Sequence, residues 1–433
     1  MITSLYSAVS GISANGTALT VIGDNIANLN TIGFKSSRVS FGDILSQSLA
    51  GGLSQIGRGV ILSDVSPLFS QGSFQTSPNV LDMAIDGEGL FIVKEASGAR
   101  YYTRAGQFSL NKEGYITNPE GLYLQGYLAD ATGKILGALS DLQLGTTQSP
   151  PNMTVNANIA VNLDAKAVPP ADPFTLDGNG DGVDDDPANF NSSTTITVYD
   201  SQGGAHTVTL YFVKTGDNAW TVNYVHRNPD PTDPNIYIEA GTQNLTFDAN
   251  GALINDNSGT AIDFDFGASV ITPQSITFDF GRGTGETPPG TGLDGTTQFA
   301  SPFSVLTINQ DGYPAGHLKT VSISEDGVIT GIFTNGQTRI LGQIALARFV
   351  APTGLLKMGK NLFAETYESG QPIIGSPNTS GLGRVLTNSL ELSNVDLAEE
   401  FIKMISMQRG FQANSRMVST VDDLMAELVN MKR

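Results

Sequence analysis

The two ends of this chain carry the same repeating pattern of side chains, and the long segment between them does not. Mostly apolar residues recur at alternating steps of three and four, the spacing at which helices pack along a left-handed coiled-coil seam. The N-terminal seam consists of Leu5, Ala8, Ile12, Asn15, Leu19, Ile22, Ile26 and Leu29. The C-terminal seam consists of Leu397, Glu400, Met404, Met407, Phe411, Asn414, Val418, Val421, Met425 and Leu428. We therefore expect the chain to return to its starting point and pair its terminal helices, as a polymer subunit does.

The two predicted helices differ in strength. The first spans residues 3–30 and contains Gly11, Gly16 and Gly23, each of which costs about 1 kcal/mol relative to alanine in a helix interior. It carries one charged side chain, Asp24, so we expect it to be packed on several sides. The second spans residues 394–431, is capped by Ser393 or Asn394, and carries charges off its seam that require water.

Composition predicts a β-rich body between these helices. The chain has 433 residues, enough for two or three domains, with 49 glycines, 20 prolines and only 15% charged residues. Its net charge of −19 argues against nucleic acid and anionic membranes as partners. Most of the excess negative charge falls in residues 151–300, which we interpret as a solvated outer domain.

A weak internal repeat suggests how the body is divided. Residues 109–117 align with residues 322–330, and each segment is followed by a turn and a strand that ends in glycine, at Gly126 and Gly342. Two similar hairpins so far apart predict one β domain interrupted by an insertion. The insertion contains a hairpin of its own, at residues 195–199 and 207–213.

The predicted fold class is therefore mainly β with terminal α-helices, in a multi-domain chain. Residues 1–32 and 392–433 form the helical coiled-coil domain, and residues 33–80 and 366–391 form irregular connectors rich in Ser, Gly and Gln. An inner β domain is expected over residues 81–146 and 297–365, and an inserted outer β domain over residues 147–296.

The N-terminal region lacks the features of a cleaved signal peptide. The first cation is Lys35, residues 1–34 contain no continuous apolar core, and no run approaches the roughly 20 apolar residues of a membrane span. The chain also contains no cysteine, which excludes disulfides and thiolate metal sites. We expect a protein that is either cytoplasmic or exported without a cleaved signal.

Catalytic motifs are not evident, so we do not expect an enzyme. His206, His226 and His317 are scattered along the chain outside any nucleophile or metal motif. The glycines of residues 281–285 follow a strand, but Glu286 stands where a dinucleotide fingerprint needs its third glycine. We interpret that segment as a turn, and we expect no cofactor.

One acidic loop has the spacing of a calcium site. Asp177, Asn179, Asp181 and Asp185 occupy positions 1, 3, 5 and 9 of such a loop, with glycine at position 6. Ala188 stands at position 12, where a bidentate carboxylate is required, so binding should be weak. The alternative is an ordinary acidic turn.

The segments at residues 25–35, 82–93 and 408–414 resemble motifs of the flagellar axial proteins, the family of rod, hook and hook-associated subunits. The resemblance begins with NIANLNTIGFK at residues 25–35 and covers most of residues 1–145 and 297–433. Its further segments are residues 71–72, 82–93, 102–109, 310–313, 335–338, 393–398 and 408–414. The hairpin at 195–213, with Trp220 downstream, is similar to the outer domain of hook subunits, whereas the acidic loop is not part of the family pattern.

This resemblance implies a structural subunit of the bacterial flagellar hook, the curved tube that joins the rod to the filament and transmits motor torque. It implies self-association, contacts with rod, hook-cap and hook–filament junction proteins, and unfolded export to the cell exterior by the flagellar type III apparatus. The alternatives are a distal rod or hook–filament junction protein and, in a different class, a secreted β-rich adhesin.

The calcium prediction can be tested by calorimetry on the purified chain. Wild-type protein should release or absorb heat at millimolar calcium, because four oxygen ligands remain in place without the twelfth. Asp177→Ala and Asp181→Ala should abolish that heat, and Asp217→Ala, an acidic residue outside the loop, should leave it unchanged. A wild-type protein without measurable heat would make the loop an ordinary turn.

Overall fold

The structure of the chain is a computed structural model that describes residues 2–45, 57–130, 132–144, 148–176, 189–230, 232, 236–257 and 259–431. The chain divides into two units. The first, which we call the helix-bearing unit, comprises residues 1–147, 319–332 and 338–433. The second, which we call the sandwich unit, comprises residues 148–318 and 333–337.

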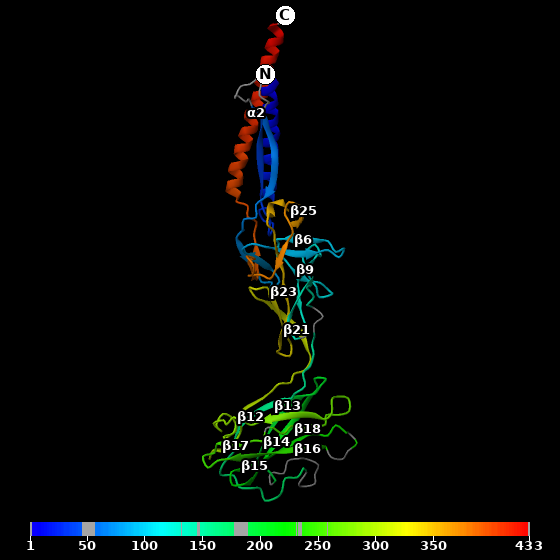
Figure 1. The fold of residues 1–433 in the computed structure, drawn as a ribbon, viewed down its shortest axis with the longest axis vertical. Coiled ribbons are helices and arrows are strands. Elements are labelled where there is room, and N and C mark those ends of the chain that lie inside the picture. The colour runs from blue at the N-terminus through cyan, green and yellow to red at the C-terminus, as the bar shows by residue number, and fades with distance from the viewer. Residues whose placement is uncertain are drawn as a thin grey trace. The chain divides into compact units, whose positions relative to one another are not determined.

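The architecture is mainly β with one helix at each end, as predicted (Figure 1). Helix α1 spans Ile2–Ala27 and helix α2 spans Leu397–Met431, and the two lie side by side in the helix-bearing unit (Figure 1). No helix in the described part of the chain is long and apolar enough to span a membrane.

The start of α2 differs from the prediction. Asp396, rather than Ser393 or Asn394, caps the helix, because its carboxylate accepts the backbone N–H groups of Ala398 at 2.8 Å and Glu399 at 3.2 Å. The Asn394 side chain is engaged elsewhere. It accepts the N–H of Ser36 at 2.8 Å and donates to the carbonyl of Leu68 at 2.8 Å, which ties the start of α2 to the segment after α1.

One large sheet and three two-stranded ladders make up the β part of the helix-bearing unit. In the large sheet, strands β21, β22, β23, β9, β5, β6, β26 and β25 follow one another as neighbours, and β10, β24, β27, β7 and β8 attach to this path. Their bounds are β5 Leu90–Lys94, β6 Arg100–Thr103, β7 Ser109–Leu110, β8 Ile116–Thr117, β9 Tyr123–Ala129, β10 Ile135–Asp141, β21 Gly316–Ile323, β22 Val328–Phe333, β23 Thr338–Ile344, β24 Leu346–Arg348, β25 Leu356–Gly359, β26 Leu362–Ala364 and β27 Ile373–Gly375. The ladders pair β1 (Ser37–Leu45) with β2 (Gly57–Pro67), β28 (Arg384–Thr387) with β4 (Met83–Asp86), and β29 (Ser389–Glu391) with β3 (Phe74–Thr76).

The internal repeat of the sequence reappears as matching hairpin turns. In the first, the N–H of Asn111 donates to Tyr115 and the N–H of Gly114 donates back to Asn111. Ser324, Val328 and Gly327 repeat both hydrogen bonds at the aligned positions. This is the three-residue hairpin loop, which needs glycine at its left-handed position.

The strands that follow these two turns meet at their glycines. β9 and β23 pair antiparallel, and the buried side chain of Leu142 covers Gly126 on one strand and Gly342 on the other. A Cβ on Gly126 would lie 2.3 Å from the carbonyl oxygen of Gln343 and 2.8 Å from Leu142. The glycines therefore permit the close approach of the two halves of the repeat.

The prediction that two segments are irregular connectors is wrong in part. Within residues 33–80 and 366–391 the structure has strands β1, β2, β3, β27, β28 and β29. Most side chains of β1 and β2 are exposed or half-buried, including the apolar Phe41, Ile61 and Leu62, so these strands lack the single buried apolar face that identifies a strand in the sequence.

The sandwich unit consists of two sheets around one aromatic core. The first sheet has the order β18–β19–β12–β20, and the second has the order β13–β14–β15–β16–β17. Their bounds are β12 Asn156–Asn162, β13 Ser192–Tyr199, β14 Ala205–Gly216, β15 Ala219–Arg227, β16 Tyr237–Phe247, β17 Leu253–Asn255, β18 Ile262–Phe264, β19 Gln274–Asp279 and β20 Ser304–Gln310. Both sheets contribute to the core, which includes Phe212, Trp220, Tyr224, Phe264 and Phe278. A short strand β11 (Gln148–Ser149) pairs with the start of β21.

The predicted hairpin in this unit is confirmed as β13 and β14, which pair from Ser192 opposite Phe212 to Tyr199 opposite Ala205. The return boundary of the insertion differs from the prediction of 296/297, since the sandwich unit continues to Leu318. The reason is strand β20, which follows the predicted boundary and pairs with β12 of this unit. Residues 297–318 therefore belong to the sandwich unit.

Gly126→Ala should destabilise the helix-bearing unit by at least about 1–3 kcal/mol, because the added methyl group meets a backbone oxygen that cannot move aside. Chemical denaturation followed by circular dichroism measures this change. Gly137→Ala on β10 is the matched control, since a Cβ there meets nothing within 4 Å. Equal unfolding midpoints for the two variants would contradict the proposed close packing at Gly126.

Candidate polymerisation interface at the terminal helices

Helices α1 and α2 pack antiparallel in a single register. Gly11 of α1 faces Asn414 of α2, Asn15 faces Gly410, and the amide of Asn25 donates to the carboxylate of Glu400 at 3.2 Å. Each step along α1 is thus matched by an equal step backwards along α2. The path of the ribbons agrees, because α1 leaves the N-terminus in the direction opposite to that in which α2 approaches the C-terminus (Figure 1).

The centre of the helix pair is a reciprocal contact between glycine and asparagine. A Cβ on Gly11 would lie 2.6 Å from the amide nitrogen of Asn414, and a Cβ on Gly410 would lie 3.1 Å from the amide of Asn15. The Asn15 amide is itself held by a 2.9 Å hydrogen bond to the carbonyl of Gly11. Two of the residues that weaken these helices therefore let them approach closely at one point.

The seam residues fall into groups in the structure. In the N-terminal set, Ala8 and Ile22 are buried and the remaining seam residues are half-buried, namely Leu5, Ile12, Asn15, Leu19, Ile26 and Leu29. Leu29 lies in a turn after α1, because the helix ends at Ala27 and not at residue 30 as predicted. On α2, Glu400 and Val421 are buried and Met404, Met407, Asn414 and Val418 are half-buried. Leu397, Phe411 and Met425 are exposed in the single chain, and the side chain of Leu428 lies outside the described residues.

The end of α2 extends past α1. In the observed register, the first residues of α1 lie opposite residues near 423 of α2, so residues 424–431 have no position of α1 facing them (Figure 1). Leu424 and Met425 are accordingly exposed, although both are apolar. Packing between the helices of one chain therefore does not use the whole predicted seam.

The β1–β2 hairpin lies against α1 and forms the third part of the helical region. The hydroxyl of Ser10 accepts the N–H of Val60 at 3.2 Å while donating to the carbonyl of Ser7. Asn25 fixes the other end of the hairpin, because its side chain donates to the carbonyl of Ser37 at 2.9 Å and accepts the N–H of Ser37 at 2.8 Å. Polar side chains of α1 thus position the hairpin.

A buried ionic cluster joins this helical region to the sheet. Glu391, at the end of β29, is unexposed and accepts from Lys35 at 2.6 Å and from Arg104 at 2.5 Å. The backbone N–H of Gly72 donates to the same carboxylate at 2.9 Å, and the ammonium of Lys35 also donates to the carbonyl of Ser70 at 2.7 Å. Burial by itself raises the pKa of Glu391, but the adjacent Arg104 and Lys35 cations outweigh it and hold that pKa below its ordinary value.

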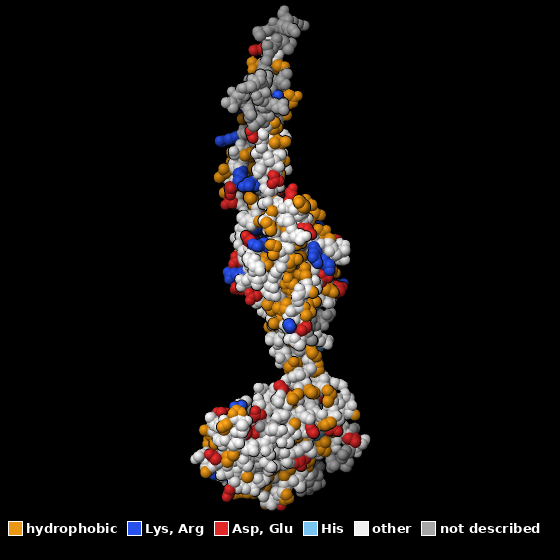
Figure 2. Space-filling model, in the orientation of Figure 1, with side chains coloured by type: hydrophobic (Ala, Val, Ile, Leu, Met, Phe, Trp, Pro, Cys, Tyr) orange, Lys and Arg blue, Asp and Glu red, His pale blue; other side chains and the backbone are white. Residues whose placement is uncertain are grey.

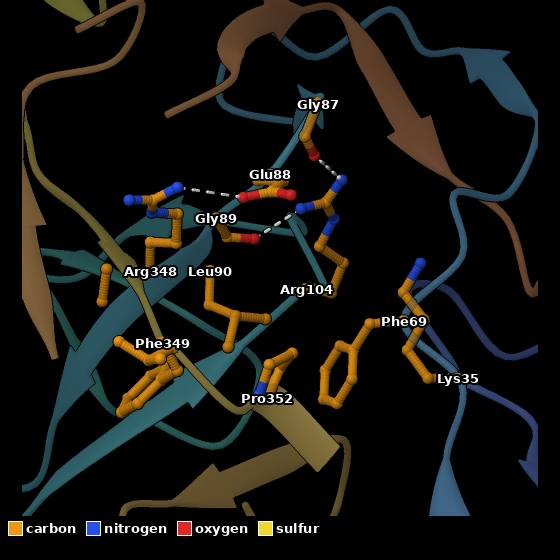
Figure 3. Close-up of a pocket in the computed structure, with 12 residues that line it drawn as sticks. Lys35, Phe69, Gly87, Glu88, Gly89, Leu90, Arg104, Arg348, Phe349 and Pro352 are labelled. Atoms are coloured by element: carbon orange, nitrogen blue, oxygen red, sulfur yellow. Dashed lines mark hydrogen bonds and ion pairs between the residues drawn. The ribbon is translucent and has the colours of Figure 1, made fainter. Parts of the chain in front are cut away.

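Arg104 also forms one wall of the pocket shown in Figure 3. Its guanidinium donates to the carbonyls of Ile85 at 2.8 Å, Gly87 at 2.7 Å and Gly89. The pocket has a volume of about 410 Å³ and a largely apolar lining that includes Leu90 and Phe349 (Figure 3). Its lining residues provide no paired nucleophile and base, so the geometry gives the pocket no catalytic chemistry.

The residues of this cluster were missed by sequence reasoning. Lys35 and Arg104 stand inside motifs that carry the family resemblance, and Lys35 is the first cation of the chain, but neither received a role. Glu391 lies in a segment predicted to be an irregular connector. A charged residue next to apolar strand residues was the available signal, and it does not by itself identify a partner hundreds of residues away.

The predicted calcium ligands Asp177, Asn179, Asp181 and Asp185 lie outside the described residues, so calcium binding stays a prediction. Within the described part of the chain, no group of three or more His, Asp or Glu side chains is arranged to hold a metal ion.

Comparison with known proteins follows the same division of the chain. Four family models match: "Flagella basal body rod protein" at residues 5–35, "Flagellar hook protein FlgE/F/G D1 domain" at 84–168, "Flagellar basal body protein FlaE D2 domain" at 162–313, and "Flagellar basal body rod FlgEFG protein C-terminal" at 386–431. The second and third models overlap at residues 162–168, one strand into the sandwich unit, which begins at residue 148.

Curated relatives match over their full length. The chain is 36% identical to the flagellar hook protein FlgE of Borreliella burgdorferi, with all of both chains covered. It is 34% identical to the proteins of the same name from Escherichia coli and Salmonella typhimurium, with 98% and 99% of this chain and 99% and 100% of those proteins covered. The chain therefore belongs to the flagellar hook protein family. It is a structural subunit of the flagellar hook and not an enzyme.

Glu391→Gln should destabilise the helix-bearing unit by about 3–5 kcal/mol, because it leaves two buried cations without a full counter-charge. The lowered pKa of Glu391 also means that its stabilising effect is present above the unfolded-state value near 4.3 and is lost as the pH falls through that region. Urea unfolding at pH 7 and at lower pH measures both effects.

The matched control for Glu391→Gln is Glu325→Gln, which removes one member of an exposed pair with Arg384. This control should leave the unfolding midpoint nearly unchanged. If Glu391→Gln behaves like the control at pH 7, the cluster does not hold the helical region to the sheet.

Proposed function

We propose that the chain assembles with copies of itself through its terminal helices into the tube of the hook. The observation that carries this proposal is the amount of large apolar surface that α2 leaves exposed. Among the described side chains of α2, the large exposed apolar residues are Leu397, Phe401, Ile402, Ile405, Phe411, Met417, Leu424 and Met425. Figure 2 shows apolar side chains at the surface of this helical region. Isolated exposed apolar residues are ordinary, but eight on one helix indicate a surface that a partner covers.

The sequence and the structure support copies of the same chain as that partner. Self-assembly is implied by the family to which the chain belongs. Helix α1 contains three glycines and one charged residue, so its exposed polar face can approach another helix without burying charge. The net charge of −19 gives no support to nucleic acid as a partner.

We further infer that the tube transmits torque between the flagellar rod and filament, outside the cell. On this proposal the chain also contacts rod, hook-cap and hook–filament junction proteins at the ends of the tube, and is exported unfolded by the flagellar type III apparatus. Full-length similarity to hook proteins, including the sandwich unit, supports this reading over a distal rod or junction protein.

The proposal predicts that Leu19→Asp combined with Ile22→Asp abolishes polymerisation. Both residues lie on the α1 seam, and Ile22 is buried there, so two carboxylates should separate α1 from α2. Electron microscopy and sedimentation measure the polymer, and the melting of the sandwich unit should be unchanged. Fibres of normal length from the double variant would contradict this use of the helices.

Val168→Asp is the control for the α1 variant. It introduces one carboxylate, against two in the α1 variant, at an apolar side chain that is already exposed on the sandwich unit. It should polymerise like the wild type, which would show that charge alone is not the cause of the defect.

A further inference from the structure

The first three turns of α2 carry an apolar ridge that the chain itself does not cover. Leu397, Phe401 and Ile405 follow one another at intervals of four residues, and Ile402 lies beside them. Their side chains are 39%, 46%, 50% and 69% exposed, in that order. We call these four residues the α2 ridge.

The same helical region contains a groove of about 360 Å³. α1 contributes Val21 and Ile22 to its lining, β1 contributes Val39 and Phe41, and α2 contributes a flank that includes Met407. Glu399 and Lys403 of α2 also line it and form an ion pair of 2.9 Å. We call this the helix–hairpin groove.

The ridge and the groove lie on opposite flanks of α2. The helix turns about 100° per residue, so residues two positions apart point in nearly opposite directions. Phe401 and Ile405 on the ridge are each two residues from Lys403, which lines the groove. A chain therefore cannot place its own ridge in its own groove, but a second copy beside it can.

The charges near the two surfaces are complementary. Arg409 continues the row of the ridge by one further turn and is exposed, and no ion pair of Arg409 occurs within the described residues. The groove carries the exposed carboxylate of Glu399, whose side chain is 66% exposed. A ridge that enters the groove of a neighbour can bring this cation toward that anion.

We propose that the ridge of one copy inserts into the helix–hairpin groove of a second copy, with Arg409 of the first copy facing Glu399 of the second. This inference rests on the proposed self-assembly and specifies the surfaces involved. Because the two surfaces differ, the contact is heterologous. Each copy that binds leaves one free ridge and one free groove, so the contact can repeat from copy to copy, and it builds an open helix wherever the rotation between copies does not close a ring.

The test uses one variant for each surface of the full chain. The ridge variant combines Phe401→Asp with Ile405→Asp, and the groove variant is Phe41→Asp. All three side chains are exposed in the single chain, so the variants should keep the melting temperature of the wild type. Each should polymerise poorly alone, with a critical concentration raised at least about tenfold, because an apolar side chain that should be buried is replaced by a charge.

A mixture of the two variants decides the geometry. The ridge variant keeps an intact groove and the groove variant keeps an intact ridge, so the mixture should form one-to-one dimers that stop growing. Analytical ultracentrifugation measures them. Dimers of either variant alone, or an equimolar mixture that stays monomeric, would overturn the proposed pairing.

The charge contact has a separate test. Arg409→Glu and Glu399→Arg should each weaken polymerisation, and the double variant should recover it, because the pair is restored with its charges exchanged. Met358→Asp, at an exposed apolar residue of β25, is the control and should polymerise normally. Failure of the double variant to recover would remove Arg409 and Glu399 from the contact.

These outcomes separate this inference from the proposed function. If wild-type protein does not polymerise under any condition, self-assembly itself fails. If the wild type polymerises and the ridge and groove variants do so equally well, self-assembly stands and the ridge-to-groove contact is wrong.

Discussion

The arrangement of the helix-bearing unit depends on one buried carboxylate. Glu391 accepts hydrogen bonds from Lys35, which follows α1, from Arg104, which follows β6, and from the backbone of Gly72. Its own carbonyl accepts the N–H of Gly33 at 2.7 Å. Segments from both ends of the chain and from the sheet therefore meet at a single residue. Removing Lys35, Arg104 or Glu391 leaves a buried charge without its full counter-charge. Such a junction tolerates only one arrangement of these segments, whatever its net contribution to the free energy of unfolding.

The helices that leave this junction are specified in a different way. α1 lacks the composition of a stable isolated helix, because it has glycine at three interior positions, and α2 has one interior glycine, Gly410. Their register is set by side chains that fit one position only: glycine against asparagine at the centre, and Asn25 against Glu400 near the junction. A slide by one turn would place the Asn414 amide against a residue with a side chain, and the buried Glu400 would lose the hydrogen bond from Asn25 and keep only that from Lys403.

The sequence could predict features that arise from periodic or local patterns. The terminal helices, the hairpins at residues 109–117 and 322–330 and the hairpin β13–β14 all follow from spacing or turn chemistry. The β1–β2 hairpin was not predicted because its apolar residues, such as Phe41, Ile61 and Leu62, are interrupted by Ser, Gly and Asp and do not form one continuous buried face. The Glu391 cluster was not predicted because its members lie far apart in the chain. The C-terminal boundary of the inserted domain was placed too early because β20 has exposed side chains at most positions.

The seam pattern in the sequence predicts more contact between the two helices of one chain than the structure shows. An apolar stripe shows which face of a helix avoids water, but it does not show whether the same chain or another copy provides the cover. In the single chain, the seam of α2 is buried or half-buried from Glu400 to Val421 except at Phe411. Leu397 and Met425, beyond this stretch, and the ridge beside the seam are exposed. These exposed residues are apolar area that the single chain leaves unburied. On the proposed self-assembly, neighbouring copies cover this area and so stabilise the helical region further.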